Sequence, residues 1–269
     1  MRSSALRFGI GGTERREDWL AVEEPLELRL TRPAGPLTLA VLMRTPGHDR
    51  ELLLGWLLAE GLLPAEFTLQ ADEENPNLWT LETPDWERVS AGARLGVSSS
   101  ACGVCGSGSI ERLAVRSEPV QWAGPPLDWR SLADLPGRLL TAQAGFRQTG
   151  GLHAAGLFAA DGDLLGALED VGRHNATDKV IGWAWEQKLD FSALILTVSS
   201  RAGFEIVQKA VTAGLPVVVA VGAASSLAVD TAQAFGLTLC AFTREGRTTV
   251  YAGEERLEAE KNSSHAERS

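Results

Sequence analysis

The run Leu194-Ile-Leu-Thr-Val198 and the later run Val217-Val-Val-Ala-Val221 decide the fold class of this 269-residue chain. Neither run alternates polar and apolar residues, so we expect strands whose two faces are both covered. Helical patterns over 204–213 and 226–235 follow them, and another strand is expected over 237–242. This alternation predicts an α/β unit, with parallel strands in the sheet and helices on both sides of it.

The same unit extends in both directions from these two strands. Strands 155–160 and 164–169 are expected to form a hairpin, because Asp161-Gly162 between them is a turn sequence. The remaining expected elements are helices over 132–144 and 175–187, strands over 193–199 and 216–221, and an edge strand over 248–251. We place the unit at residues 126–253, with the domain boundary in the segment 117–130, which contains three prolines.

The N-terminal part, residues 1–125, reads as a smaller α+β domain. Strands are expected over 24–31 and 37–43 and a helix over 51–63. Residues 71–93 are expected to be irregular, with Trp79 in a short strand. The charged tail, 254–269, has little to bury and is expected to be disordered.

Composition limits the classes of function. The formal net charge of −10 argues against general affinity for nucleic acid or anionic membrane, since phosphates would be repelled. No signal peptide is recognisable and no apolar run approaches the roughly 20 residues of a membrane-spanning helix. We therefore expect a soluble, cytoplasmic protein with neither a nucleic-acid nor a membrane partner.

Two of the three cysteines lie in an uncharged segment, Leu95-Gly-Val-Ser-Ser-Ser-Ala-Cys102-Gly-Val-Cys105-Gly-Ser-Gly-Ser-Ile110. Its glycines and serines predict a mobile loop that presents sulfur. The CxxC pair could be half of a zinc site, a redox dithiol, a persulfide carrier or an idle pair. The third cysteine, Cys240, is expected in a buried strand.

Several turns near the predicted strand ends suit an anion, because ligands of open α/β sheets bind outside the carboxyl ends of the strands. Arg173 and His174 lie at a helix entrance, where Asn175 and Asp178 resemble a capping pair. We expect Asp178 and the neighbouring Lys179 to be exposed.

Two further turns carry the other candidates for this anion site. Ser200-Arg201 and Ser225-Ser226 follow two of the predicted parallel strands. After the last long strand comes Phe242-Thr243-Arg244-Glu245-Gly246-Arg247, whose aromatic ring and arginines suit a purine and phosphates. An ordinary hairpin turn is the alternative for that segment.

These segments together resemble the FdhD family, the formate dehydrogenase accessory sulfurtransferases, from about Val22 to Tyr251. The resemblance rests on the following segments in order: Glu23-Glu-Pro-Leu-Glu27, Met43-Arg-Thr-Pro-Gly47, Ala59-Glu-Gly61, Cys102-Gly-Val-Cys-Gly106, Thr149-Gly-Gly-Leu-His-Ala154, Glu169-Asp-Val-Gly-Arg-His-Asn175, Asp178-Lys-Val-Ile-Gly182, Ser200-Arg201 and Ser225-Ser-Leu-Ala228.

The resemblance implies a sulfur carrier that accepts persulfide sulfur from a cysteine desulfurase. It would pass the sulfur to the molybdenum or tungsten of a bis(molybdopterin guanine dinucleotide) cofactor and so activate formate dehydrogenase. Cys102 would bear the persulfide, Cys105 would support transfer, and the turn 242–247 would bind the cofactor. An insertion chaperone that binds the cofactor without handling sulfur is the alternative.

The resemblance also implies a homodimer and a three-layer, cytidine-deaminase-like C-terminal domain that binds the cofactor. The zinc signature of deaminases is absent, so deaminase activity does not carry over. No tightly held metal is expected in the isolated protein.

Overall fold

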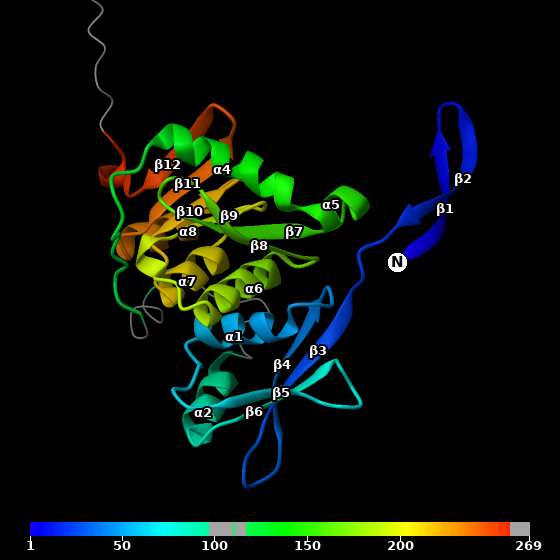
Figure 1. The fold of residues 1–269 in the computed structure, drawn as a ribbon, viewed down its shortest axis with the longest axis vertical. Helices are drawn as coiled ribbons and strands as arrows, with labels where there is room; N and C mark the ends of the chain where they lie inside the picture. The colour runs from blue at the N-terminus through cyan, green and yellow to red at the C-terminus, as the bar shows by residue number, and fades with distance from the viewer. Residues whose placement is uncertain (97–109, 111–116, 259–269) are drawn as a thin grey trace, which may run out of the picture.

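The computed structural model describes residues 1–96, 110 and 117–258 (Figure 1). A six-stranded sheet with its helices forms one unit, a four-stranded sheet forms a second, and a two-stranded hairpin projects from the pair. Within the described stretches, no helix has the length and apolar character needed to cross a membrane.

The six-stranded sheet has the order β12-β11-β10-β9-β7-β8. Strands β9 (Ile195–Val198), β10 (Val217–Ala220) and β11 (Thr238–Arg244) are parallel, as predicted, and every residue of β9 and β10 is buried. Strands β7 (His153–Phe158) and β8 (Leu164–Asp170) form the expected hairpin, and β12 (Arg247–Ala252) is the antiparallel edge strand. Because β7 is also antiparallel to β9, the sheet is mixed rather than wholly parallel.

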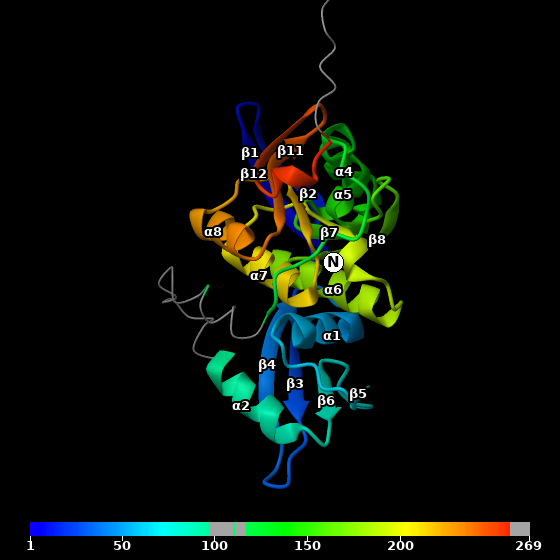
Figure 2. The same ribbon diagram turned by 90° about the vertical axis from the view of Figure 1, so that its left-hand side faces the viewer.

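Helices cover both faces of this sheet (Figure 2). Helix α4 (Trp129–Ala142) lies along one face, with the short α5 (Ala144–Thr149) beside it. Helices α6 (Arg173–Glu186), α7 (Phe204–Ala213) and α8 (Ser226–Ala234) pack on the other face, and a short 3-10 turn, η1 (Phe191–Ala193), precedes β9. The structure thus has helix, sheet and helix layers here, while the likeness to cytidine deaminases stays a prediction.

The second unit has the sheet order β4-β3-β6-β5. It contains β3 (Glu24–Leu30), β4 (Leu37–Arg44), β5 (Thr68–Ala71) and β6 (Leu78–Glu82), together with α1 (Asp49–Ala59) and α2 (Trp86–Gly96). The expectation that 71–93 is irregular is therefore wrong, although Trp79 does lie in a strand, as predicted. Strand β6 pairs in parallel with β3 and buries Leu81 in the core of this unit, and that pairing between distant segments gives its short sequence a strand conformation.

The two units meet where α1 crosses α6 (Figure 1). A methyl group on Gly55 of α1 would overlap the carbonyl oxygen of Asp178, and one on Gly182 of α6 would overlap the carbonyl oxygen of Glu51. The glycines let the two helix backbones approach closely, so side chains from both units share one interface.

The segment 117–127 and the residues after β12 pack on the six-stranded unit. Val120 contributes to its core and donates a backbone hydrogen bond to Phe235 at 2.9 Å. The sequence predicts a disordered tail from residue 254, but Glu254–Arg256 form the 3-10 turn η2 and Leu257 bridges to Leu127. That prediction is wrong for residues 254–258, and 259–269 lie outside the described residues.

Candidate functional site

Several strands of the large sheet end, or begin, at the same edge. Strands β8, β9 and β10 end just before Val171, Ser199 and Val221, β11 carries Thr243 near its end, and antiparallel β7 begins at His153. Residues that follow the carboxyl ends of parallel strands are the usual ligand-binding positions in such folds. The topology therefore gathers these five side chains around one place.

A cavity of about 550 Å³ lies at this edge, against the face covered by α4 and α5. Its volume falls in the range of cavities that hold small molecules, roughly 300–1,000 Å³. The two helices and the loop after them supply a largely apolar wall, and the strand ends supply polar groups. The lining residues are Pro136, Gly137, Leu139, Leu140, Gln143, Phe146, Gly150, Gly151, Leu152, His153, Val171, Ser199, Val221, Thr243, Arg244 and Glu245.

His153 and Ser199 form a polar pair in this cavity. The Ser199 hydroxyl accepts a hydrogen bond from the Ala154 amide at 2.9 Å and lies 3.4 Å from Nδ1 of His153. The Ser199 hydroxyl keeps a proton and a second lone pair, so it can donate to Nδ1 of His153 or accept from it, according to the tautomer of the imidazole. Burial, together with the positive charges of Arg173 and His174, lowers the pKa of His153. Burial and the two neighbouring basic groups therefore favour the neutral form of the His153 imidazole.

The predicted turn 242–247 contributes three residues to the cavity lining: Thr243, Arg244 and Glu245. The segment forms a β-hairpin, the alternative considered for it: Phe242 lies in β11, Gly246 lies in the turn and Arg247 begins β12, and none of the three lines the cavity. Phe242 has a left-handed backbone conformation with φ of 49°, and the residue is 43% exposed. A left-handed conformation is uncommon for a bulky residue and marks local strain.

Hydrogen bonds tie the predicted Ser200-Arg201 turn to this segment. The Gly222 amide donates to the Ser200 carbonyl at 3.0 Å, and the Phe242 amide donates to the Gly222 carbonyl at 2.9 Å. Ser200 and Arg201 thus lie beside the turn after β10 without lining the cavity. The three turns after β9, β10 and β11 form one connected rim.

His174 lies at the start of α6, and its Nε2 pairs with the carboxylate of Glu205 at the start of α7. The hydrogen bond from His174 lowers the pKa of that carboxyl group. His174 is close enough to His153 to affect its pKa, although it does not line the cavity. Of the predicted binding residues, His174 is therefore at the periphery of the site.

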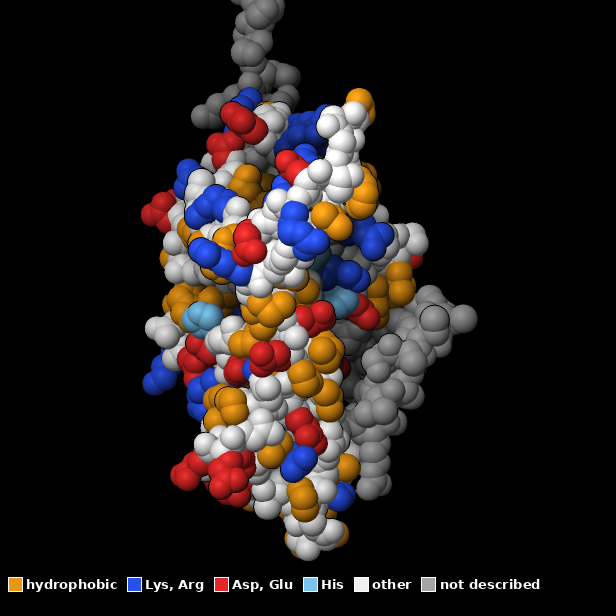
Figure 3. Space-filling view, turned by 90° about the vertical axis from the view of Figure 1, so that its right-hand side faces the viewer, with side chains coloured by type: hydrophobic (Ala, Val, Ile, Leu, Met, Phe, Trp, Pro, Cys, Tyr) orange, Lys and Arg blue, Asp and Glu red, His pale blue; other side chains and the backbone are white. Residues whose placement is uncertain are grey.

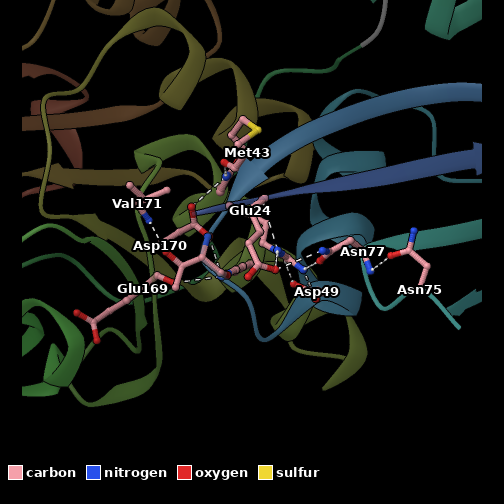
Figure 4. A network of polar contacts seen from close by, with 12 residues as sticks. Glu24, Met43, Asp49, Asn75, Asn77, Glu169, Asp170 and Val171 are labelled. Atoms are coloured by element: carbon pink, nitrogen blue, oxygen red, sulfur yellow. Dashed lines mark hydrogen bonds and ion pairs between the residues drawn. The ribbon is translucent and has the colours of Figure 1, made fainter. Parts of the chain in front are cut away.

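The capping role expected for Asn175 is wrong, because α6 begins two residues earlier, with Gly172 at its N-cap and no side-chain cap. Asn175 instead donates to Asp170 at 3.0 Å and to the Met43 carbonyl at 2.7 Å. Lys179, expected to be exposed, is buried and pairs with Asp170 at 2.7 Å. The motif thus holds the turn between β8 and α6 in place (Figure 4).

This polar network also joins the two units. The Thr45 amide donates to Asp170 at 3.0 Å, and Lys179 donates to the Thr45 carbonyl at 2.8 Å. Glu169 accepts from the amides of Gly145 and Phe146 at the start of α5, both at 2.8 Å. Consecutive acidic residues therefore fix the cavity wall on one side and the second unit on the other.

Asp178, also expected to be exposed and to cap the helix, is buried beneath the α1–α6 crossing. It pairs with Lys209 of α7 at 2.9 Å, and Glu60 approaches the same ammonium group at 3.7 Å. Burial raises the pKa of Asp178 to about 6, despite the attraction of Lys209. The prediction that Asp178 is exposed is therefore wrong, because its ion pair with Lys209 allows the carboxylate to be buried.

Cys102 and Cys105 lie outside the described residues, as does nearly all of the loop expected over 95–110. Cys240 is buried in β11, as predicted, and burial raises the pKa of its thiol to about 12. In the described part of the chain, no three His, Cys, Asp or Glu side chains are grouped as a metal site would need.

Sequence reasoning missed His153 and Ser199 as site residues, and it missed the wall formed by α4 and α5. The run Thr149-Gly-Gly-Leu-His153 before a predicted strand was the available signal for His153. The contribution of Ser199 follows from its place directly after β9, one residue before the predicted Ser200. The wall depends on how α4 folds over the sheet, which local sequence does not specify.

Comparison with known proteins places the chain among recognisable relatives. The family model described as FdhD/NarQ family matches residues 21–258. A protein of Nocardia farcinica named "Sulfur carrier protein FdhD" is 45% identical, over 95% of this chain and 94% of its own length. A protein of the same name from Streptomyces coelicolor is 42% identical, over 95% of each chain.

A solved structure shares the fold. It is of a protein from Desulfotalea psychrophila proposed to be a formate dehydrogenase accessory protein, and it superposes with a TM-score of 0.75 at 21% identity. The match covers 96% of this chain and 99% of that one. Both units of the present structure therefore have counterparts in a solved structure.

Proposed function

Because the chain belongs to the FdhD/NarQ family, we propose that it is a sulfur carrier that serves formate dehydrogenase. The observation that carries this proposal is the identity of more than 40%, over nearly full length, to proteins named sulfur carriers. The cavity at the sheet edge supports it, since a carrier must hold the acceptor of its sulfur while transfer takes place.

Cys102 is the group that carries sulfur in this proposal. Its thiolate attacks the terminal sulfur of a persulfide on a cysteine desulfurase, and the cysteine thiolate of the donor leaves. The product is a persulfide on Cys102, which is covalent catalysis by a thiol nucleophile. The acceptor then attacks that terminal sulfur and supplies the electron pair of the new bond, the S–S bond breaks with the Cys102 thiolate as leaving group, and Cys105 supports the transfer. The protein is a sulfurtransferase in this sense.

The acceptor substrate is the molybdenum or tungsten bis(molybdopterin guanine dinucleotide) of formate dehydrogenase. A cavity of about 550 Å³ suits one guanine nucleotide end of this molecule rather than the whole of it. The apolar side chains of α4 and α5 offer a surface for a flat ring. Arg244 offers charge-assisted hydrogen bonds to a phosphate, and the imidazole of His153 offers a further hydrogen bond.

Sulfur loading tests the carrier role directly. After incubation with a cysteine desulfurase and cysteine, the intact protein is expected to gain about 32 Da, the mass of one sulfur atom. Cys102→Ala is expected to remove the gain and to abolish activation of formate dehydrogenase. An insertion chaperone would activate the enzyme without any gain in mass, and that result would contradict the proposal.

Titration with GDP tests the cavity. Arg244→Ala is expected to weaken GDP binding by roughly tenfold or more, because a hydrogen bond to a charged group contributes about 1.5–3 kcal/mol. The matched control is Arg130→Ala, since Arg130 is exposed on α4 and does not line the cavity. Equal affinity of the Arg244 and Arg130 variants would show that the nucleotide binds elsewhere.

A further inference from the structure

Gln143 occupies the junction between the two helices that wall the cavity. It ends α4 as the C-cap of that helix and begins α5 as its N-cap. Its backbone amide donates to the Leu140 carbonyl at 3.2 Å, and its carbonyl accepts from the Arg147 amide at 3.1 Å. The carboxylate of Glu169 in turn fixes two amides near the start of α5 to the sheet. The backbone of Gln143 is therefore held in place from both sides.

The side chain of Gln143 is buried, yet it has no hydrogen-bond partner among the described residues. The residue is 4% exposed and lines the cavity. Its carboxamide does not cap α5, and no other described group bonds to it. Its polar atoms are not fully enclosed by protein, so the carboxamide keeps open surface, and the residue meets open space at the cavity. Because a buried amide without a hydrogen bond destabilises a protein, this one calls for a partner that enters the cavity.

The surroundings of Gln143 select the chemistry of that partner. Leu139, Phe146 and Leu152 line the same cavity, so an ionised group beside them would lose its hydration without compensation. A flat, neutral group can pack on these side chains instead. To satisfy the carboxamide it must also carry a hydrogen-bond donor beside an acceptor, because a carboxamide presents one of each. The edge of a nucleic-acid base has this pattern.

The charged groups of the cavity lie toward its open side. Arg244 and Glu245 are exposed, whereas Gln143 is buried. Figure 3 views the molecule from the side on which α5 and the N-terminal hairpin, formed by β1 (Arg2–Gly9) and β2 (Gly12–Trp19), lie in Figure 1. Lys and Arg side chains gather in the upper half of that face, and Asp and Glu side chains gather lower down. The upper half attracts anions, so a diphosphate would be held at the exposed end of the cavity, away from Gln143.

We infer that Gln143 is the residue that binds the base of the nucleotide. This inference rests on the proposed function, in which the acceptor substrate ends in guanine. The Gln143 carboxamide donates from Nε2 to O6 of guanine and accepts at Oε1 from N1–H, while the ring packs on the apolar wall. The diphosphate reaches Arg244 at the exposed end. The base is thus the inner end of the bound nucleotide, and the rest of the cofactor extends outward from the cavity.

Gln143→Met tests this assignment, because methionine has a similar length and offers no donor and only a weak acceptor. Titration calorimetry is expected to show GDP binding weakened by about tenfold or more, since two hydrogen bonds to the base are lost. The affinity for pyrophosphate is expected to stay the same, because phosphates bind at Arg244. The matched control is Gln148→Met, in the same helix, since Gln148 is exposed and does not line the cavity. It is expected to bind both ligands as the natural protein does.

Inosine diphosphate identifies the edge of the base that Gln143 contacts. Its base keeps N1–H and O6 but lacks the 2-amino group of guanine. The natural protein is therefore expected to bind inosine diphosphate and GDP with similar affinity, and Gln143→Met is expected to weaken both by the same factor. Much weaker binding of inosine diphosphate to the natural protein would show that the 2-amino group is recognised, and the assigned edge would be wrong.

Urea unfolding without ligand separates base binding from a structural role. Removing a buried amide that has no partner is expected to leave the free energy of unfolding unchanged or to raise it. A Gln143→Met variant that is less stable but binds GDP normally would overturn the inference, because the amide would then serve the fold. Normal GDP binding by this variant counts against the role of Gln143 alone. A natural protein that binds neither GDP nor pyrophosphate would overturn the nucleotide cavity of the proposed function together with this inference.

Discussion

At the scale of single residues, Phe242 combines an unfavourable backbone conformation with an exposed aromatic ring. A left-handed conformation costs a residue other than glycine roughly 1–2 kcal/mol. Phe242→Gly is therefore expected to be more stable than Phe242→Ala by about 1 kcal/mol, because only glycine relieves the strain. Urea unfolding of the two variants measures the difference.

The same pair of variants separates strain from ligand binding. If the ring contacts a nucleotide at the rim of the cavity, both variants are expected to bind GDP more weakly than the natural protein. Equal stability of the glycine and alanine variants would contradict the strain argument, whatever happens to GDP binding.

His153 gives a prediction about pH. Its pKa is lowered in the folded protein by burial and by Arg173 and His174, so below about pH 6.5 the unfolded chain binds more protons than the folded one. The contribution of His153 to stability is thus present above pH 6.5 and is lost as the pH falls through its folded pKa.

His153→Gln is expected to reduce the loss of stability between pH 7.5 and pH 5.5, as measured by urea unfolding at both values. The equivalent control is His48→Gln, because His48 is exposed and lies far from the cavity in the sequence. A natural protein and a His153 variant with the same pH dependence would show that this imidazole titrates normally.

At the scale of elements, the closest packing is at the crossing of α1 and α6. A methyl group on Gly182 would overlap the Glu51 carbonyl, and overpacking of this kind costs about 1–3 kcal/mol or more. Gly182→Ala is therefore expected to be destabilising. Gly137→Ala in α4 is the matched control, since nothing lies within 4 Å of the new methyl group and alanine favours a helix.

Chemical denaturation of both glycine variants tests this packing. The Gly182 variant is expected to unfold at lower urea concentration than the natural protein, and the Gly137 variant at the same or a higher concentration. A Gly182 variant as stable as the natural protein would mean that the two helices can separate without loss.

How much of the fold the sequence could predict differs between elements. The apolar runs in β9 and β10 clearly predict buried strands, because a strand that is covered on both faces can be apolar at every position. The strands β5 and β6 lack such runs. Strand β6 pairs with distant β3, and β5 pairs with β6, and local sequence does not reveal these pairings.

In the candidate site, too, some features could be predicted from local sequence and others depend on contacts between distant residues. The turn 242–247 could be placed near the cavity because it follows a recognisable strand. The charges of Asp178 and Lys179 predict an exposed helix surface, yet both residues are buried. Asp178 pairs with Lys209 of α7, and Lys179 pairs with Asp170 at the end of β8. Tertiary pairing of that kind leaves no local signature.

At the scale of the whole molecule, the network around Asp170 makes the two units depend on each other. Thr45 follows β4 in one unit, while Asp170 and Lys179 belong to the other, and the Asp170–Lys179 pair is buried almost completely. A buried charge without its partner costs about 3–5 kcal/mol. The units are therefore expected to unfold together rather than one after the other.

Lys179→Met tests this coupling, because it leaves the Asp170 carboxylate buried without its cation. The free energy of unfolding is expected to fall by about 3–5 kcal/mol. Native-state hydrogen exchange follows each unit separately, through the amides of Leu28 in β3 and of Val218 in β10, both of which are buried. In the natural protein the two amides are expected to report the same opening free energy, and in the variant both values are expected to fall together. A loss confined to β10 would show that the four-stranded unit is stable without the network, and the two units would then be independent domains.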